Sequence, residues 1–204
     1  MSAAGKTWIG ADPGGRGNFG LAILRPDGTA CTWCLNCTDD AITVIRENVA
    51  GGPGGAGVDA PLWWSSGRSS ARRADQWLRD RHHLSGGKVQ AANSLRGAAL
   101  VQGMMFVQRL RELFPGTPVS EAHPKAVMKG LKKGSGQAFF KHFGVRVKRT
   151  DFSEHERDAA IAAVAAREGF EGRWPNDLSA TRGESEQDPS TFWLAPVHYF
   201  WPVE

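Results

Sequence analysis

The sequence predicts an α/β domain in which helices cover both faces of a mixed β-sheet. Two observations lead to this fold class. Three apolar runs near the start of the chain are joined by short turns, which is typical of an antiparallel meander. Short apolar runs then alternate with helical segments. Strands that are separated by helices need crossover connections, so the later strands are expected to join the sheet in parallel.

The three meander strands are expected at residues 7–12, 19–25 and 29–37. The turn Pro26-Asp27-Gly28 is a strong hairpin signal between the second and third of them. The first strand ends at Asp12, directly before a Pro-Gly-Gly turn. A lone carboxylate on a core strand costs several kcal/mol unless it is paired or holds a metal. We therefore ask first what Asp12 binds.

The middle of the chain alternates helices with short strands. Asp39 and Asp40 are expected to cap a helix over residues 41–49, which the Gly-rich run 51–57 ends. Short strands are then expected at 58–62 and 119–123, and each carries a carboxylate. Between them the pattern predicts a polar, arginine-rich helix and a long apolar one, at residues 69–84 and 94–114. The inner residues expected of the long helix include Leu95, Val101, Met105, Leu110 and Leu113.

The last third begins with two short helices, expected at residues 126–131 and 137–143. The clearest helix of the chain is predicted at 153–167, where Ser153 and Glu156 form a capping box and the alanine-rich body can lie close against a sheet. A polar, flexible segment is expected at about 171–190. Residues 191–201 are expected to form a late strand or to pack on the core. All 204 residues are interpreted as one domain, with a polar helical insertion at about 66–90.

Composition narrows the function classes. The apolar share of 41% is enough for a core, and no run approaches the about 18 apolar residues that a membrane span needs. The first residues contain no apolar signal core, so we expect a cytoplasmic protein without a membrane partner. Its oligomeric state stays open, and a homodimer is one possibility. The net charge of +4 permits a polyanionic partner without requiring one.

Three cysteines, Cys31, Cys34 and Cys37, follow one another at intervals of three. The odd number argues against a disulfide framework. The spacing also occurs in metal sites, but no fourth cysteine completes one, and the run is interpreted as a strand. Buried reduced thiols are therefore the favoured interpretation, with a metal site as the alternative.

Basic residues concentrate between Ala122 and Thr150, a segment that contains no Asp or Glu. One interpretation is a solvated face, and the other is a surface that contacts a phosphate backbone. Under the second interpretation, the nucleic-acid-binding residues are Lys125, Lys129, Lys132, Lys133, Arg146, Lys148 and Arg149.

Four acidic groups occupy comparable positions. Asp12, Asp59 and Glu121 each stand in or at the end of an apolar strand, and Asp158 lies near the start of the last helix. His155 precedes Asp158 by three residues, so the two share a helix face. In folds with crossover connections, binding and active sites lie where the strands end, so we expect these residues to share one site. Each carboxylate alone is more typical of a cap, salt bridge or turn.

Such a carboxylate set suits Mg²⁺ or Mn²⁺, and two such ions can promote phosphodiester hydrolysis. In this hypothesis Asp12 bridges the ions, Glu121 or Asp59 holds one of them and Asp158 the other. His155 is a ligand or moves protons. The predicted catalytic residues are Asp12, Glu121, Asp158 and His155, and the predicted metal ligands are Asp12, Asp59, Glu121 and Asp158.

The segment from Ala11 to Ala22 resembles the first hairpin of RuvC-type resolvases and other RNase H-like nucleases. Together with Asp59-Ala60-Pro61-Leu62, Glu121-Ala122-His123-Pro124 and Arg157-Asp158-Ala159-Ala160, it resembles a family of predicted RNase H-like nucleases. The resemblance covers about residues 7–168. It implies a five-stranded mixed sheet with its first three strands antiparallel, and a divalent-metal site at Asp12, Glu121 and Asp158.

Two departures accompany the resemblance. RuvC-type enzymes carry two acids on the last helix, and His155 occupies the earlier of those places here. Trp63-Trp64 replaces small residues, and core packing is favoured for these tryptophans over stacking on bases.

The leading hypothesis is thus a metal-dependent nuclease that acts on DNA or RNA. A non-catalytic adaptor that binds nucleic acid or protein is the main alternative, because His155 replaces an acid. A phosphate-binding ATPase-like protein is a third possibility. Such proteins share an Asp-x-Gly hairpin but need two domains, which about 200 residues do not provide.

Overall fold

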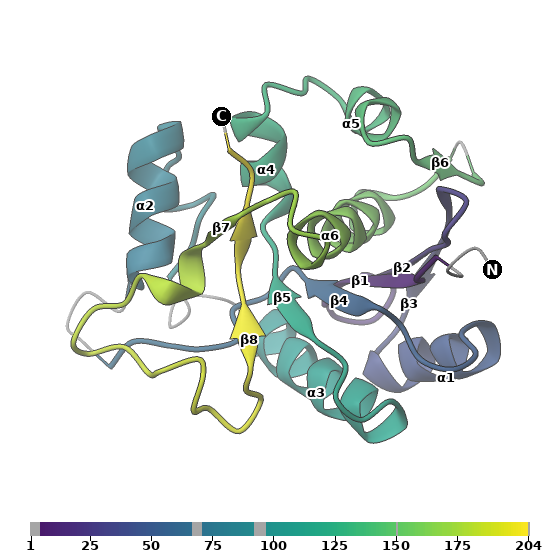
Figure 1. Cartoon of the computed structure of the whole chain (residues 1–204), viewed down its shortest axis with the longest axis horizontal. Helices are drawn as coiled ribbons and strands as arrows, with labels where there is room; N and C mark the ends of the chain where they lie inside the picture. Colours follow the sequence, from purple (N-terminus) through teal and green to yellow (C-terminus); the bar gives the residue numbers. More distant parts are fainter. Residues whose placement is uncertain (1–4, 67–70, 92–96, 150, 204) are drawn as a thin grey trace.

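The computed structural model describes residues 5–66, 71–91, 97–149 and 151–203. A seven-stranded mixed sheet forms its centre, in the order β6-β3-β2-β1-β4-β5-β8. Helices α4, α5 and α6 lie on one side of this sheet, and α1 and α3 lie on the other (Figure 1). The predicted α/β class with a mixed sheet is confirmed.

The first three strands form the predicted antiparallel meander. They are β1 (Trp8–Asp12), β2 (Phe19–Leu24) and β3 (Thr29–Leu35). In register, Asp12 lies opposite Gly20, and Ala22 lies opposite Thr32. Nearly every side chain of β1 and β2 is buried, because helices cover both faces of these central strands.

The strands β4 (Gly55–Val58) and β5 (Val119–Glu121) continue the sheet in parallel beyond β1. The Gly-rich run 51–57 was expected only to end a helix, and the strand was expected at 58–62. That prediction is wrong by three residues. A Cβ on Gly57 would lie 2.0 Å from the carbonyl oxygen of Ala162, so this strand needs glycine to admit α6.

Two edge strands extend the sheet beyond the five that the resemblance implied, and the second lies within residues 191–201, where a late strand was one of the two expectations. The strand β6 (Arg146–Val147) pairs with β3, and β8 (Val197–His198) pairs with β5. The sheet therefore has seven strands instead of five. A separate two-stranded sheet joins β7 (Asn176–Asp177) to β9 (Phe200–Trp201), and the short 3₁₀ helix η2 (Leu178–Ala180) follows β7. The expected loop 171–190 thus contains short ordered elements.

The helix α6 (Glu154–Phe170) is the central helix of the fold. Its N-terminus has the predicted capping box, in which Ser153 accepts from the backbone of Glu156 and Glu156 accepts from that of Ser153. A Cβ on Gly10 would lie 1.8 Å from the carbonyl oxygen of Ala159. The alanine body of α6 and the glycines of β1 and β4 therefore bring backbone close to backbone.

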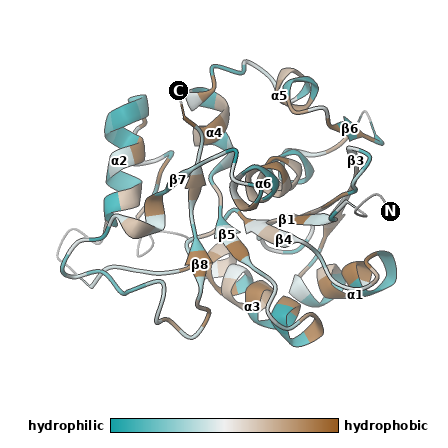
Figure 2. Cartoon of the chain, in the orientation of Figure 1, coloured by the Kyte–Doolittle hydropathy of each residue, from teal (hydrophilic) through white to brown (hydrophobic). Residues whose placement is uncertain are grey.

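The other helices are α1 (Thr38–Asn48), α2 (Arg73–His82), α3 (Gly97–Leu113), α4 (Pro124–Gly130) and α5 (Gly136–His142). Helix α1 begins before Asp39 and Asp40, so these residues lie in its first turn and do not cap it. Figure 2 shows α2 as mainly hydrophilic, as its sequence predicted. The expected starts of α2 and α3 at Ser69 and Ser94 lie outside the described residues.

Helix α3 turns a different face inward from the one predicted. Its buried residues are Gly103, Phe106, Val107 and Leu110. Of the residues expected inside, Leu110 is buried, but Val101 is 55% exposed and Met105 is 39% exposed. Leu95 lies outside the described residues. None of the helices within the described ranges is long and apolar enough to span a bilayer.

Candidate metal centre

Two carboxylates leave the sheet at the same edge. Asp12 is the last residue of β1, and Asp59 directly follows β4. The two strands are parallel neighbours, with Ala11 beside Val58, and the Asp59 amide donates to the Ala11 carbonyl at 2.8 Å. Parallel strands end on the same edge of a sheet, so these two side chains meet as the sequence predicted.

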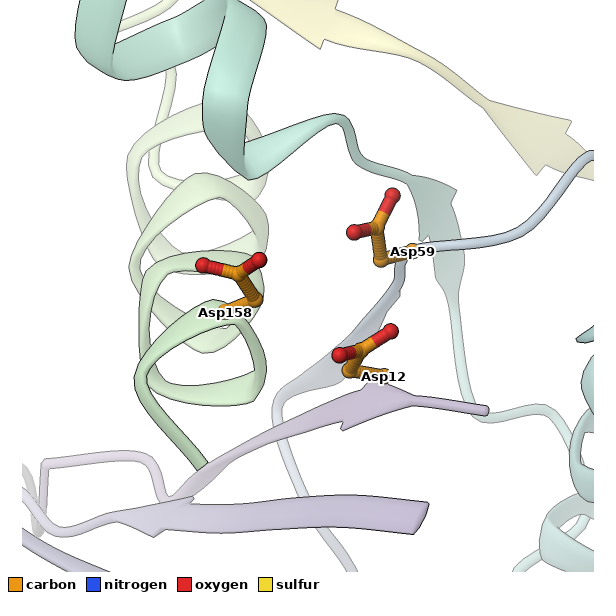
Figure 3. Close-up of side chains that lie close together, drawn as sticks. All are labelled: Asp12, Asp59 and Asp158. Carbon is orange, nitrogen blue, oxygen red and sulfur yellow. The ribbon is translucent and has the colours of Figure 1, made fainter. Parts of the chain in front are cut away.

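The third carboxylate comes from α6. Asp158 lies in the second turn of this helix, which is held close to the sheet above Gly10 and Gly57. One carboxylate oxygen from each of Asp12, Asp59 and Asp158 lies within 4.8 Å of the other two. Figure 3 shows the three side chains gathered around a common space between β1, β4 and α6. We call this group the aspartate triad.

The surroundings of the aspartate triad disfavour its negative charge. Burial is the main cause that raises the pKa of Asp12, Asp59 and Asp158. The charges of Asp12 and Asp158 raise the pKa of Asp59 further, so that it lies well above its ordinary value. A cation between the carboxylates would reverse this penalty.

Two members of the triad already have partners. His155 Nδ1 lies 2.7 Å from Asp12 Oδ2, and this hydrogen bond is the main cause that raises the pKa of His155. Arg157 Nη2 lies 2.7 Å from Asp158 Oδ1. The Asp59 carboxylate differs, because no residue in the described part of the chain donates a hydrogen bond to it or forms an ion pair with it. The triad thus contains one carboxylate that no described residue pairs with, and hard oxygen ligands of this kind can hold a metal ion.

Glu121 does not join the aspartate triad, and the prediction that it is a metal ligand is corrected by its contacts. Its Oε1 and Oε2 accept from Arg72 at 2.5 and 2.8 Å. Oε2 also accepts from the amide of Leu62 at 3.0 Å. Asp59, which the sequence offered as an alternative ligand, takes the place that Glu121 was expected to fill.

Arg72 is the site residue that sequence reasoning missed. It was assigned to a polar helix that buries little, yet it is 1% exposed. Besides Glu121 it binds Asp75 at 2.8 and 3.0 Å, and its guanidinium lies 4.1 Å from the centre of the Trp63 ring. We call Arg72, Asp75 and Glu121 the buried ion network. Because Glu121 is far from Arg72 in sequence, no local pattern indicated this pairing.

A pocket of about 240 Å³, which we call the triad pocket, opens beside the aspartate triad. Its lining includes Asp12, Asp59, Lys88, His123 and Lys125. The Lys88 carbonyl can only accept a hydrogen bond, so the His123 Nε2 atom 3.0 Å away must carry a proton. Burial lowers the pKa of His123 to about 4, so its ring is neutral at pH 7. Lys125 binds Glu154 at 2.8 Å at the rim.

The predicted nucleic-acid-binding residues lie on α4 and around α5 and β6. Several meet acids that the segment itself lacks: Arg146 approaches Asp27 at 3.9 Å, and Arg149 approaches Asp151 and Glu156 at 3.6 and 3.8 Å. Lys129 donates to the carbonyl of His83. Lys132 and Lys148 are exposed, and Lys133 is half-buried. The charge of the segment is therefore partly neutralised by contacts within the fold.

The cysteines do not form a site within the described residues. Cys34 is exposed and donates to the carbonyl of Gly17, while Cys31 and Cys37 are half-buried. The expectation of buried thiols is therefore wrong, because β3 is covered less completely than β1 and β2. All three thiols are free, as expected.

Comparison with known proteins returns no match: no protein-family model, no curated protein and no solved structure matches this chain. The function of the protein is therefore inferred from the geometry of its site.

Proposed function

We propose that this protein is a divalent-metal-dependent nuclease that hydrolyses phosphodiester bonds. The observation that carries the proposal is the convergence of Asp12, Asp59 and Asp158 within 4.8 Å from three separate elements, with Asp59 left unpaired by the described residues. Three carboxylates and no imidazole or thiolate in the set favour Mg²⁺ or Mn²⁺ over zinc.

The fold supports the proposal as an RNase H-like arrangement. The central strands run in the order β3-β2-β1-β4-β5, with the first three antiparallel and the next two parallel to β1. An antiparallel meander followed by parallel strands is compatible with the RNase H-like sheet that we propose, although this sheet has seven strands and the resemblance implied five. The triad draws its members from β1, from the end of β4 and from α6, whereas the resemblance implied Glu121 on β5 in the place that Asp59 takes.

Each residue of the site has a role in the proposed reaction. Water adds to phosphorus, the bond from phosphorus to the leaving oxygen breaks, and the water gives up a proton. The metal, held by the triad, would activate this water and stabilise the leaving oxygen. His155 holds Asp12 in place through the 2.7 Å hydrogen bond and is half-exposed, so it can also take up the proton. Lys125, at the pocket rim, faces the phosphate.

The substrate backbone would follow the basic side chains of α4, α5 and β6. Lys129, Lys132, Lys148 and Arg149 are exposed along these elements. Such contacts neutralise phosphates without reading sequence, so binding should weaken steeply as salt increases.

One observation favours a second candidate, a non-catalytic nucleic-acid-binding adaptor. His155 replaces an acid and occupies an oxygen of Asp12, while Arg157 occupies an oxygen of Asp158. These contacts leave fewer free ligand atoms for two metal ions. They are compatible with a protein that binds nucleic acid on this fold without cleaving it.

A cleavage assay separates the two candidates. Branched, single-stranded and hybrid substrates are incubated with Mg²⁺ or Mn²⁺ and either the wild type or Asp12→Asn. Asp39→Asn is the matched control, because Asp39 is an exposed carboxylate on α1. A nuclease cleaves at least one substrate only with metal, and only Asp12→Asn loses the activity. Binding that survives Asp12→Asn, with no cleavage by the wild type in either metal, favours the adaptor.

A further inference from the structure

Exposed apolar side chains gather in one groove beside the aspartate triad. Within the described ranges, five large hydrophobic residues remain exposed. Four of them line this groove: Trp64, Val101, Met105 and Trp193. Trp64 is 41% exposed and Trp193 is 60% exposed. The groove has a volume of about 500 Å³. A cluster of this kind marks a binding surface more often than singly scattered residues do.

Aromatic contacts hold Trp64 against the C-terminal part of the chain, and Trp193 extends this aromatic cluster. The ring of Trp64 meets Phe192 edge to face with centroids 4.9 Å apart, and Phe192 in turn contacts Trp193 at 5.4 Å. The carbonyl of Trp64 accepts from the amide of Gln187 at 3.0 Å, which ties this segment to the C-terminal part of the chain. A flat ring that is ordered before binding loses little entropy when a second ring stacks on it.

Two chain segments connect the groove to the proposed metal centre. Trp64 follows Asp59 by only five residues, a span of at most about 17 Å even for an extended chain. On α3, Ala99 lines the triad pocket and the next residue, Leu100, lines the groove. A Cβ on Gly103 would lie 2.6 Å from Ala60, so α3 packs directly on the segment between the two cavities.

The two adjoining cavities differ in charge, as the charged phosphate and the uncharged base of a nucleotide do. The triad pocket is lined by charged side chains of both signs, with Lys88 and Lys125 opposing the carboxylates of Asp12 and Asp59, and a cation and a phosphate would lie there. Among the described residues, the groove lining contains no acidic or basic side chain and consists of aromatic and aliphatic residues with one glutamine. It therefore suits the uncharged face of a base, and a base within a duplex cannot offer that face because its neighbours cover it.

We propose that this aromatic groove stacks unpaired nucleobases a few nucleotides from the scissile phosphate, so that the enzyme acts on single-stranded nucleic acid. The inference rests on the proposed nuclease function for the identity of the phosphate site. It goes beyond that function by naming the substrate class. Base–aromatic stacking tolerates any base, so sequence preference should be weak.

Binding is measured by fluorescence anisotropy with labelled 20-nucleotide single strands of DNA and RNA and with the corresponding duplexes, in Ca²⁺ to suppress turnover. The wild type should bind the single strands more tightly than the duplexes. Trp193→Ala should weaken single-strand binding about 5- to 160-fold, the range expected for one lost stack, and Trp193→Phe should retain most of the affinity. Val203→Ala is the matched control, because Val203 is equally exposed but lies in another pocket. The DNA and RNA arms show which strand is preferred.

Each outcome decides between the groove and its alternatives. Equal single-strand affinity in Trp193→Ala and Val203→Ala overturns the inference. A wild-type dimer in analytical ultracentrifugation that Trp193→Ala converts to a monomer also overturns it, because a second copy then occupies the groove. If the strands bind through Trp193 but no metal promotes cleavage, base stacking stands and the hydrolase proposal fails. If cleavage occurs but Trp193→Ala does not change single-strand binding, the hydrolase proposal stands and base stacking in the groove fails.

Discussion

Replacing Asp59 with asparagine should stabilise the metal-free protein while removing the proposed metal site. In the metal-free state, Asp59 faces Asp12 and Asp158 within 4.8 Å, and the described residues offer its carboxylate no partner. The charges of its two neighbours raise its pKa, which means that they oppose its ionisation. The amide of asparagine keeps the shape of the side chain and removes this repulsion.

The distance in the structure sets the magnitude. Two unit charges at 4.8 Å repel by about 332/(20 × 4.8), or about 3.5 kcal/mol, at an effective dielectric constant of about 20. Two such pairs give about 7 kcal/mol if all three carboxylates are ionised. Protonation of one carboxylate and the cationic neighbours Arg157 and Lys125 relieve most of this repulsion. We therefore expect Asp59→Asn to gain about 1 to 3 kcal/mol at pH 8.

The pH dependence has a definite sign. A carboxyl group with a raised pKa holds more protons in the native than in the unfolded protein once the pH exceeds its ordinary value of 3.8. Native stability contributed by such a group therefore falls as the pH rises through this window. The advantage of Asp59→Asn over the wild type should consequently be larger at pH 8 than at pH 5.

The assay is urea unfolding followed by tryptophan fluorescence, on protein treated with EDTA and on protein with added Mn²⁺. At 100 times its dissociation constant, Mn²⁺ should stabilise the wild type by about 2.7 kcal/mol and leave Asp59→Asn unchanged. Asp39→Asn should behave as the wild type in both conditions. A variant at Asp59 that is less stable than the wild type without metal, yet gains equally from Mn²⁺, would refute the shared cation site.

Three further predictions test the neighbouring structure. Glu121→Gln should destabilise the protein by about 3 to 5 kcal/mol in urea unfolding, because it leaves Arg72 buried with less negative charge, and calorimetry should still detect Mn²⁺ binding. Gly10→Ala should cost about 3 kcal/mol in the same assay, since the new methyl group meets the carbonyl of Ala159. His123 has a pKa of about 4 against 6.5 when unfolded, so the wild type should lose about 3 kcal/mol as pH falls between these values, and His123→Gln should lose less.

Local patterns were sufficient to predict the strands and helices that carry the triad. Asp12 could be placed because an apolar run ended at a Pro-Gly-Gly turn, and Asp158 because a capping box marked the start of its helix. Asp59 was named as a ligand even though its strand was placed three residues too late. That error came from interpreting glycines as breakers, whereas Gly57 is needed inside the strand by the approach of α6.

Contacts between distant segments could not be predicted in the same way. The pairing of Glu121 with Arg72 joins residues 49 positions apart and depends on how α2 packs. For α3, apolar residues occur nearly all around the helix, so periodicity could not decide which face is buried. Val101 and Met105 consequently turned out to line the exposed groove.

The aspartate triad and the acids of the buried ion network differ in how their negative charge is balanced. This difference is the strongest physical argument for a cation at the triad. Glu121 and Asp75 share the buried guanidinium of Arg72, which compensates them within the chain itself. Asp12 and Asp158 have only partial partners, and the Asp59 carboxylate has none within the described residues. A protein gains nothing in stability from holding three aspartates so close together unless another charge joins them. Because Arg72 lies beside Glu121 and Asp75 instead, a cation bound from solution, as proposed, would supply the charge that the described residues do not give to Asp59.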